Sequence, residues 1–451
     1  MKVIKFGGSS LATGPQFQRV IDILQADPDR QVVVTSAPGK AKEFPVKVTD
    51  LLLKYADQAI ADEDFSETVR ALKNRYGSIA QYFHVDKWEI QDLYAQIDDL
   101  NNHHYPTYRY LRAAFAAHGE YLNAQLLTMI LKALGEDARF MDPRQIHLHF
   151  EGRNTVLDEE ATYDALGQIK LEDGVRYIFP GFFGYNHEGR MVTFDRGGSD
   201  ITGAILAKGL KADVYENFTD VSAIYAVNPN LVDHPRAIHS MSYNEMRELS
   251  YAGFAVFHDE AIIPAIKGQI PINIKNTNDP SAPGTWIGPS KEQKSEEPIT
   301  GIAASKHFAA LYIHRYLLNK GIGVTLRLLQ ILNRHHVSYE HMPSGVDDLT
   351  IIFDRDQLND EQIEGIQTDI QNEFHPDTMT WHDNFALIMI VGQGMVGRVG
   401  TLTEIVTPLK EAGISLGMVN QGASEISIML GLEPKDADAA VQAIYHHFFD
   451  K

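Results

Sequence analysis

Cysteine is absent from the 451 residues of the chain. Its absence excludes disulfide bonds, thiolate nucleophiles, iron–sulfur clusters and cysteine-based zinc sites, and it suits the reducing cytoplasm in which we expect the protein to reside. Long hydrophobic runs are lacking as well: the longest, such as residues 385–391, are strand-sized, whereas a bilayer needs about 20 apolar residues. We therefore expect no membrane association and no secretion signal.

Positive charge is scarce, with 40 Lys and Arg against 60 Asp and Glu, which gives a formal net charge of −20. Binding to nucleic acid depends on clustered cations, so this balance argues against a nucleic-acid partner. Small anionic ligands need only a local positive site, so a negative net charge does not exclude them. Apolar residues make up 44% of the chain, as in folded proteins, and at about 100–200 residues per domain the length predicts two to four domains.

Short apolar runs alternate with longer stretches of helical period. The predicted strands are Val3–Phe6, Gln31–Thr35, Val175–Phe179, Met191–Phe194, Asp213–Glu216 and Pro271–Ile274; the predicted helices are Val48–Ala61, Tyr121–Leu134, Ile201–Lys208 and Tyr243–Ala252. Several strands are apolar throughout, as in a sheet that is buried on both faces. The alternation predicts an α/β domain of three layers with a mainly parallel sheet.

An internal repeat occupies the C-terminal third of the chain. Residues 323–352 and 400–429 align without a gap at an offset of 77, so that Gly345 matches Gly422. A turn-rich and polar stretch over residues 276–300 precedes the repeat and predicts a domain boundary. Two copies are too few for a solenoid, so the repeat predicts a paired module.

Two glycine loops are candidate sites for a phosphate group. In Lys5-Phe-Gly-Gly-Ser-Ser10, a buried strand runs into glycines whose N–H groups can form an anion-binding nest beside a lysine. In Phe194-Asp-Arg-Gly-Gly-Ser-Asp-Ile-Thr202, a strand precedes glycines and a helix start, which offers free N–H groups to an anion. Each segment taken alone is also compatible with a plain turn, and Asp200 with a helix cap. Two such loops in one domain favour phosphoryl transfer, and neither has the Walker A pattern.

Two other segments allow a simpler interpretation. Thr219-Asp-Val-Ser-Ala-Ile-Tyr225 carries a hydroxyl, a carboxylate and an aromatic ring after a strand, and by itself it favours an Asx turn with a core tyrosine. Gly392-Gln-Gly-Met-Val-Gly397 matches a dinucleotide-binding fingerprint, but the next predicted strand ends in Asn420 and lacks the acid that such a site requires. We expect these glycines to open a small-ligand or subunit contact.

The motifs together resemble those of aspartate kinases. Lys5-Phe-Gly-Gly-Ser-Ser10 is similar to the family's K-F-G-G-[ST]-S, Arg196-Gly-Gly-Ser-Asp200 to its R-G-G-S-D, and Thr219-Asp-Val with Tyr225 to its T-D-V…[IV]-Y. The repeat resembles the family's two C-terminal ACT modules. The resemblance extends over essentially the whole chain and is nearest to the single-function, lysine-regulated branch.

The resemblance implies an amino-acid-kinase (carbamate-kinase-like) fold and a reaction. The fold is a three-layer αβα domain over residues 1–298, followed by two ferredoxin-like βαββαβ ACT modules over residues 299–382 and 383–451, with interleaving of the modules left open. The reaction transfers the γ-phosphoryl group of ATP to the β-carboxylate of L-aspartate and gives 4-phospho-L-aspartate, the first step of lysine, threonine and methionine biosynthesis. ATP and Mg²⁺ are the implied cofactors, and no residue is assigned to a resident metal.

Site residues also carry over from the resemblance. The implied catalytic residues are Lys5, Arg196 and Asp200; the residues at the phosphates and nucleotide are Gly7, Gly8, Ser9, Gly197, Gly198, Thr219, Asp220 and Tyr225; the aspartate-binding residues are Thr49, Glu120, Arg196 and Ser199. The substrate carboxylate is ionised at pH 7, because its reference pKa is about 4, so a general base is unnecessary. Holding two anions in line is the remaining task, and it suits Lys, Arg, glycine N–H groups and Mg²⁺.

Three features depart from the family's pattern. Ala255 stands where many members have a lysine near the nucleotide, and Asn230 replaces an arginine; Lys267 and Lys275 are candidates to compensate. The stretch Lys40–Lys47 is longer than in the family, and we expect it to reshape the rim of the substrate site. These departures keep open a catalytically impaired protein that senses an amino acid through its ACT modules. A third hypothesis is a kinase of this fold with another acidic substrate.

The ACT modules imply regulation and assembly. By resemblance we expect an amino-acid effector, with lysine as the first candidate, and a homodimer or dimer of dimers formed through these modules. The candidate effector residues are Gly323, in the glycine turn of the first copy, and the facing residues Ser338, Tyr339 and Glu340; they are chosen by position alone.

Overall fold

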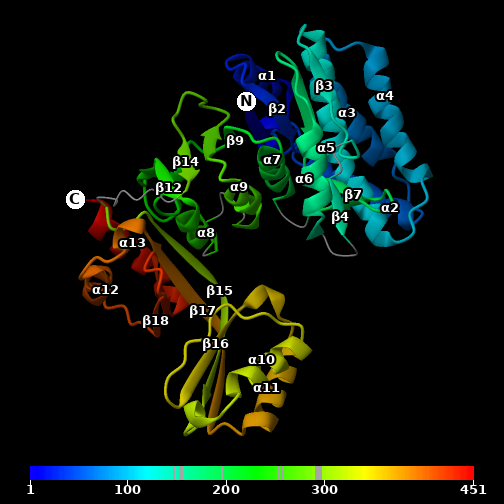
Figure 1. Cartoon of the computed structure of the whole chain (residues 1–451). Coiled ribbons are helices and arrows are strands. Elements are labelled where there is room, and N and C mark those ends of the chain that lie inside the picture. Colours follow the sequence, from blue (N-terminus) through cyan, green and yellow to red (C-terminus); the bar gives the residue numbers. More distant parts are fainter. Residues whose placement is uncertain are drawn as a thin grey trace. The chain divides into compact units, whose positions relative to one another are not determined.

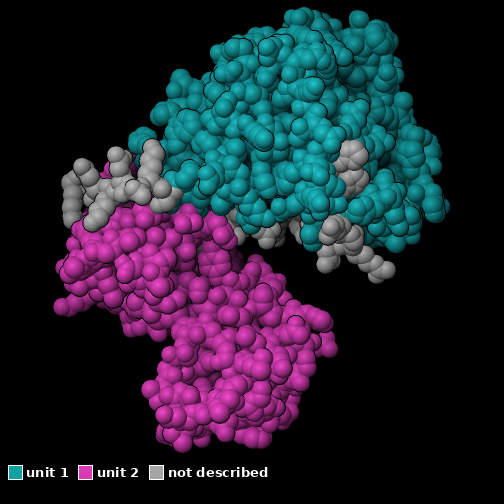
Figure 2. All heavy atoms as spheres, in the orientation of Figure 1, with its two compact units in different colours: residues 1–224, 237–243, 256–291 teal, residues 225–236, 244–255, 292–451 magenta. Residues whose placement is uncertain are grey.

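The computed structural model describes residues 1–145, 148–151, 156–194, 197–251, 253–254, 259–289 and 297–450. The chain divides into two compact units, which Figure 2 distinguishes by colour. The first unit comprises residues 1–224, 237–243 and 256–291, and the second comprises residues 225–236, 244–255 and 292–451. Within the described ranges, no helix combines the length and the apolar content needed to cross a bilayer.

An eight-stranded sheet forms the centre of the first unit, in the order β12-β14-β13-β9-β1-β2-β6-β3. Its strands are β1 (Lys2–Phe6), β2 (Arg30–Thr35), β3 (Ala138–Phe140), β6 (Arg176–Pro180), β9 (Val214–Thr219), β12 (Ser240–Ser242), β13 (Ile272–Asn276) and β14 (Thr285–Gly288). All neighbours run parallel except β13 and β14. Except for Met191–Phe194, the strands predicted from apolar runs all lie in this sheet, which confirms the predicted parallel sheet.

Helices cover both faces of this sheet. One face packs, through a core that includes Ile4 and Phe6, against α1 (Gly14–Gln25), α2 (Val48–Ile60), α3 (Ser66–Tyr82), α4 (Lys87–Asp99) and α5 (Tyr108–Ala133). Side chains alternate along a strand, so Lys5 faces the opposite layer. That layer contains α7 (Gly198–Gly209), with α6 (Glu159–Gln168) and α9 (Ile263–Gly268) beside it (Figure 1). The predicted helix from Tyr121 begins earlier, at Tyr108, because helical residues continue upstream to the Thr107 cap.

A smaller sheet completes the first unit. The strands β4 (His149–Glu151), β5 (Val156–Leu157), β7 (Phe183–Asn186) and β8 (Met191–Thr193) form a four-stranded sheet in the order β5-β4-β7-β8. The predicted strand at Met191 belongs to this small sheet. The strands β10 (Ile224–Tyr225), where the chain passes from the first unit to the second, and β11 (Ala237–Ile238), in the first unit, are two residues long.

The second unit contains a five-stranded antiparallel sheet in the order β16-β15-β17-β19-β18. Its elements are β15 (Gly301–His314), β16 (Asp348–Asp354), β17 (Thr378–Val391), β18 (Met418–Gln421), β19 (Ser427–Leu432), α10 (Val324–Arg334), α11 (Asp360–Phe374), α12 (Thr401–Glu411) and α13 (Ala437–Phe449), together with α8 (Tyr243–Tyr251) from Asn244 on. The long strands β15 and β17 pair along almost their whole length. The C-terminal half of β15 also pairs with β16, and the C-terminal half of β17 with β19.

The repeat is visible in the paired elements but is not perfect. The helices α10 and α12 both begin after a glycine with positive φ, Gly323 at 75° and Gly400 at 89°. Strand β18 has its counterpart at residues 341–344, where the structure shows isolated bridges from His341 and Ser344 only. Pro343 lies between them and has no N–H to donate, which explains why this copy lacks the regular strand.

The glycines of the fingerprint-like segment have an intrachain steric role. A Cβ on Gly392 would lie 2.4 Å from Pro298 O, and one on Gly394 would lie 2.0 Å from Glu297 O. The backbone of residues 297–298 therefore passes too close for any other residue type at these positions. This close approach accounts for the two glycines without a ligand or a subunit contact.

Candidate functional site

The candidate site lies at the carboxyl edge of the central sheet. Strands β1, β2 and β9 run parallel, so the segments that follow them meet at this edge. Lys5 Nζ lies 2.7 Å from Asp200 Oδ1, with only 10% and 18% of the two side chains exposed. Asn217, next to Lys5 in the strand register, donates through Nδ2 to the same Oδ1 at 2.7 Å. The sequence motifs that carry Lys5 and Asp200 are thus brought together as a largely buried ion pair.

The first glycine loop follows β1 and contacts the segment after β2. Gly7 N donates to Phe218 O at 3.2 Å, and Gly39 N donates to Gly8 O at 2.8 Å. A Cβ on Gly8 would lie 2.7 Å from Ala37 O, so only glycine fits this approach. Ser9 lies in the short 3₁₀ turn that follows. The loop therefore lies beside Lys5, as the sequence predicts.

The second glycine loop opens α7. Gly197 has a φ of 61° and caps the helix, and Gly198, Ser199 and Asp200 form its first turn. A helix start has free N–H groups and a partial positive charge, which favour an anion. Ser199 is buried, and a Cβ on Gly181 would lie 2.7 Å from its side chain, so the backbone directly after β6 packs tightly against α7. Arg196 lies outside the described residues.

Glu120, on α5, is the most unusual titratable residue near the site. Its side chain is buried, Oε1 accepts from Ala37 N at 3.0 Å, and Oε2 has no partner among the described residues. Burial raises the pKa of this carboxyl from 4.5 to about 8, against the backbone hydrogen bonds that lower it. An unpaired buried carboxylate oxygen is well suited to bind a cationic group, such as an ammonium.

Three other predicted residues lie on different elements and make few side-chain contacts. Thr49 is the second residue of α2 and is partly buried. Thr219 ends β9, and its hydroxyl donates to Asp220 Oδ1 at 3.2 Å. Tyr225 belongs to the second unit, not to the unit that contains the sheet edge.

The candidate effector residues lie in the second unit, and three of them are tied to it by hydrogen bonds or backbone geometry. Gly323 caps α10. Ser338 Oγ donates to Gln357 Oε1 at 2.8 Å, and Gln357 Nε2 donates to Ser338 O at 2.9 Å. Glu340 N donates to Ile352 O at 2.8 Å, and its carboxylate accepts from the hydroxyl of Tyr251. Tyr339 is 43% exposed.

Two polar residues at the edge escaped the sequence motifs. Asn217 holds Asp200, and a buried asparagine within an apolar strand was the available signal. Asn123, on α5, donates to Ser36 O at 2.7 Å, while its Oδ1 has no partner in the described part of the chain. Both residues act across long sequence separations, which no motif encodes.

Neither lysine considered as a substitute at the nucleotide is free. Lys267 Nζ donates to Glu159 Oε1 at 2.6 Å, and Lys275 Nζ donates to Ala282 O at 3.2 Å. Ala255 lies outside the described residues, and Asn230 N donates to Asn228 Oδ1 within its turn.

No group of three or more metal-ligating side chains exists among the residues that the structure describes. Mg²⁺ does not require one, because it is commonly bound by one or two carboxylates together with substrate phosphates. Both side-chain contacts of Asp200 within the described ranges are made through Oδ1. The chemistry of this carboxylate fits such a partial site.

Comparison with known proteins gives a consistent assignment. The model of the amino acid kinase family matches residues 1–276, and that of the ACT domain matches residues 388–448. Aspartokinase 3 of Bacillus subtilis is 44% identical, with 100% of this chain and 99% of the relative covered. The crystal structure of Clostridium acetobutylicum aspartate kinase superposes with a TM-score of 0.86 at 36% identity, covering 99% of this chain and 100% of the other. The structure of E. coli aspartokinase III in complex with lysine and aspartate superposes with a TM-score of 0.76 at 25% identity. The superposition covers 100% of this chain and 99% of the other. The chain therefore belongs to the amino acid kinase family and, within it, to the aspartokinases.

Proposed function

We propose that this aspartokinase transfers the γ-phosphoryl group of ATP to the β-carboxylate of L-aspartate and forms 4-phospho-L-aspartate, the first step of lysine, threonine and methionine biosynthesis. One observation carries the proposal above the others. Lys5 Nζ and Asp200 Oδ1 lie 2.7 Å apart where the two glycine loops meet the carboxyl edge of the sheet. The full-length match to Bacillus subtilis aspartokinase 3 supports the same activity.

Lys5 is the residue to which we assign the transferring phosphoryl group. The nucleophile is a carboxylate that is already ionised, so catalysis consists of holding two anions in line and stabilising the charge that develops on the phosphoryl oxygens. Lys5 supplies a full positive charge, and the N–H groups of Gly7, Gly8 and the first turn of α7 supply preorganised dipoles. Asp200 holds the lysine ammonium, and Asn217 in turn holds Asp200 by donating to the same Oδ1.

Glu120 is the residue to which we assign the substrate ammonium. Its unpartnered Oε2 accepts a charge-assisted hydrogen bond when aspartate binds, which also stabilises the ionised form of the buried carboxyl. Arg196 is assigned to the substrate α-carboxylate, with Thr49 and Ser199 beside it. Thr219, Asp220 and Tyr225 are assigned to the nucleotide.

Mg²⁺ is the metal that this chemistry calls for. Bound together with the ATP phosphates, it supplies charge screening between two anionic substrates. We assign the metal to Asp200. Both of its side-chain contacts within the described ranges are made by Oδ1, which leaves Oδ2 to bind the metal.

Regulation by lysine is the second part of the proposal. The ACT match and the E. coli relative in complex with lysine and aspartate support an amino-acid effector at the second unit. A homodimer or a dimer of dimers fits the edge strand β18, where Val419 is 46% exposed and which can pair with another copy. We place the protein in the cytoplasm, where its substrates are made and used.

A hydroxamate assay on the full chain tests the activity. With ATP, Mg²⁺ and L-aspartate, we expect acyl phosphate that is trapped as hydroxamate, and none with L-glutamate in place of L-aspartate. No turnover, together with a thermal shift on adding L-lysine, would instead support the sensor that has lost its kinase activity. Turnover with a different acid alone would support the third hypothesis.

A further inference from the structure

Arg75, on α3, is a buried cation that the proposed reaction does not use. Only 1% of the residue is exposed. Its Nη2 donates to Gly39 O, and its guanidinium lies 4.2 Å from the centre of the Phe44 ring. Nε and Nη1 have no hydrogen-bond partner among the described residues, and burial lowers the pKa of the group to about 10, so it stays charged at neutral pH. A buried cation without a hydrogen-bonded carboxylate is costly, which calls for a reason.

The segment that Arg75 holds connects two parts of the candidate site. Ala37 N donates to Glu120 Oε1 at 3.0 Å, and Gly39 N donates to Gly8 O at 2.8 Å. A Cβ on Gly39 would lie 2.6 Å from the carbonyl carbon of Gly8, so the two backbones are in direct contact. Fixing Gly39 therefore fixes the distance between Glu120 and the glycine loop beside Lys5.

The neighbouring residue on α3 supports the same region. Tyr76 is fully buried, and its hydroxyl donates to Gly119 O at 2.9 Å, one residue before Glu120. Consecutive side chains of one helix thus reach the backbone on both sides of the proposed ammonium site. A rigid helix with two such contacts is the arrangement that preorganised binding needs.

Phe44 explains how the longer loop is anchored. Within residues 40–47, Ala41 and Phe44 exchange two backbone hydrogen bonds of 2.9 and 3.0 Å, and Glu43 beside them is exposed. The ring of Phe44 packs against the Arg75 guanidinium in a cation–π contact. Arg75 therefore holds both the start and the middle of this loop.

We propose that Arg75 is a positioning residue for aspartate: from α3 it fixes the Gly39 carbonyl and the Phe44 ring, and so sets the spacing between Glu120 and the Gly8 loop. The inference rests on the proposed function and adds a residue that contacts neither substrate. Its signature is a rise in KM for aspartate without a comparable rise in KM for ATP. The Gly8 loop, assigned to the phosphates, keeps its own anchor in the hydrogen bond from Gly7 N to Phe218 O, and the other nucleotide residues lie on other segments.

The test compares Arg75→Met, Arg75→Lys and the control Arg70→Met in the full chain. Arg70 lies on the same helix in an exposed pair with Glu67, with 71% of its side chain exposed. We expect Arg75→Met to raise KM for aspartate by about tenfold or more while KM for ATP changes less than about twofold. Arg75→Lys should recover part of the loss, since it keeps the charge, and Arg70→Met should behave as the wild type.

A packing role predicts different results. Replacing a buried charge with an apolar group of similar volume is often neutral or stabilising, so a packing-only arginine leaves both KM values unchanged in Arg75→Met. Folded Arg75→Met with a wild-type KM for aspartate, or with equal increases in both KM values, would overturn the inference. If Arg75→Met does not fold, Phe44→Leu on the loop provides the same readout, with a smaller selective rise expected and no rise refuting it. Absence of turnover in the wild type would instead count against the proposed function.

Discussion

At the scale of single residues, Glu120 shows how burial and binding oppose each other. Its carboxyl is buried with one oxygen unpaired, and burial raises its pKa to about 8. The folded protein therefore keeps a proton on Glu120 that the unfolded chain releases above pH 4.5. Such a residue reduces stability at neutral and alkaline pH, which is expected where a group serves a ligand rather than the fold.

Replacing Glu120 with glutamine should expose this conflict. Since the folded pKa is raised, the free energy of unfolding of the wild type falls as pH rises from 4.5 to about 8 and then levels off. We expect Glu120→Gln to melt at a higher temperature than the wild type at pH 8.5 and at a similar temperature near pH 5, while its KM for aspartate rises at least about tenfold. Melting curves over this pH range, with the exposed Glu63→Gln as control, measure the effect. Parallel curves for Glu120→Gln and the wild type would contradict it.

Lys5 should be needed for turnover but not for folding. We expect Lys5→Ala to lower kcat by about a hundredfold to a thousandfold, because it removes the charge assigned to the transferring phosphoryl group. Circular dichroism should show that the fold is retained, while the loss of the ion pair with Asp200 lowers the melting temperature. The exposed Lys132→Ala, at the end of α5, is the matched control. Turnover near the wild-type level in Lys5→Ala would contradict the assignment.

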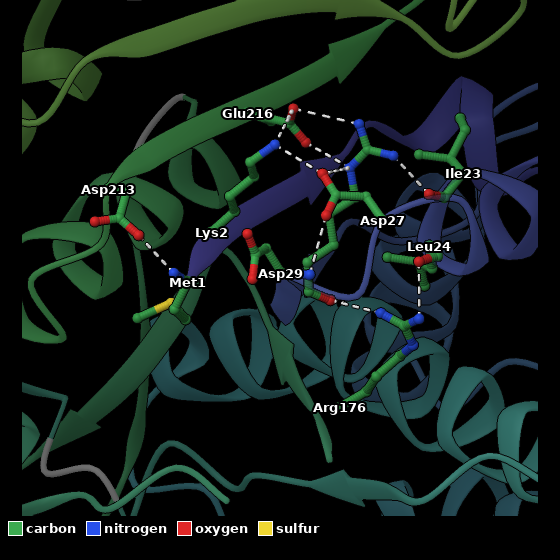
Figure 3. A network of polar contacts seen from close by, with 10 residues as sticks. Met1, Lys2, Ile23, Leu24, Asp27, Asp29, Arg176, Asp213 and Glu216 are labelled. Carbon is green, nitrogen blue, oxygen red and sulfur yellow. Dashed lines mark hydrogen bonds and ion pairs between the residues drawn. The ribbon is translucent and has the colours of Figure 1, made fainter. Parts of the chain in front are cut away.

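At the scale of elements, the C-terminal end of α1 is capped from other strands. The helix has no basic residue in its last turn. Arg30, from β2, donates to Ile23 O at 2.6 Å, and Arg176, from β6, donates to Leu24 O at 2.8 Å (Figure 3). Each arginine is also paired with a carboxylate, Arg30 with Glu216 and Arg176 with Glu136. Arg30 thus satisfies a carbonyl group that the helix end leaves unpaired, and Arg176 adds a charged donor to Leu24 O, which also accepts from Asp27 N.

Removing one of these arginines should therefore cost stability without affecting chemistry. We expect Arg176→Met to lower the free energy of unfolding by about 3 kcal/mol, because two buried carbonyl groups and one carboxylate lose a charged donor. Both KM values should stay unchanged, since the network lies at the amino ends of the strands, opposite the candidate site. Chemical denaturation measures the loss.

The matched control for this network is Arg139→Ala. Arg139 pairs with Glu172 on the surface, with 42% and 61% of the side chains exposed. Surface pairs contribute little to stability, so we expect no measurable change in its denaturation midpoint. An equal loss in the two variants would show that the buried network has no special role.

At the scale of the whole molecule, the net charge of −20 and the anionic substrates are compatible. Screening limits the reach of surface carboxylates to about 8 Å at physiological ionic strength, so a few cations and backbone dipoles determine the local sign at Lys5. The second unit is the part of the molecule assigned to an effector. Its candidate residues Ser338 and Glu340 are hydrogen-bonded within that unit.

Lysine binding should therefore depend on Glu340, in the second unit, while nucleotide binding does not. We expect L-lysine to raise the melting temperature of the full chain, and Glu340→Ala to abolish this shift while the shift with ATP and Mg²⁺ remains. Thermal shift measurements with each ligand separate the two. Glu364→Ala, an exposed residue of α11, should retain both shifts. A normal lysine response in Glu340→Ala would remove this residue from the effector site.

The sequence by itself determined the elements and the family. The informative patterns are apolar strands followed by glycines, helical periods and the repeat at an offset of 77. They predict structure because backbone sterics and the burial of apolar side chains act on short segments of the chain. These patterns predicted the parallel sheet, the helices α2 and α7, and the glycine loops that carry Lys5 and Asp200. They did not place the start of α5, because a helix continues wherever no residue stops it.

Only the tertiary structure decided which distant groups meet. Asn217 holds Asp200, Ala37 meets Glu120, and Arg75 holds Gly39, each across many residues of sequence. It also decided that β15 and β17 serve both copies of the repeat, and that Gly394 makes room for Glu297. The physical reason is the same in each case: a buried polar group is stable only with a partner, and the partner is chosen by chain topology, which local sequence does not encode.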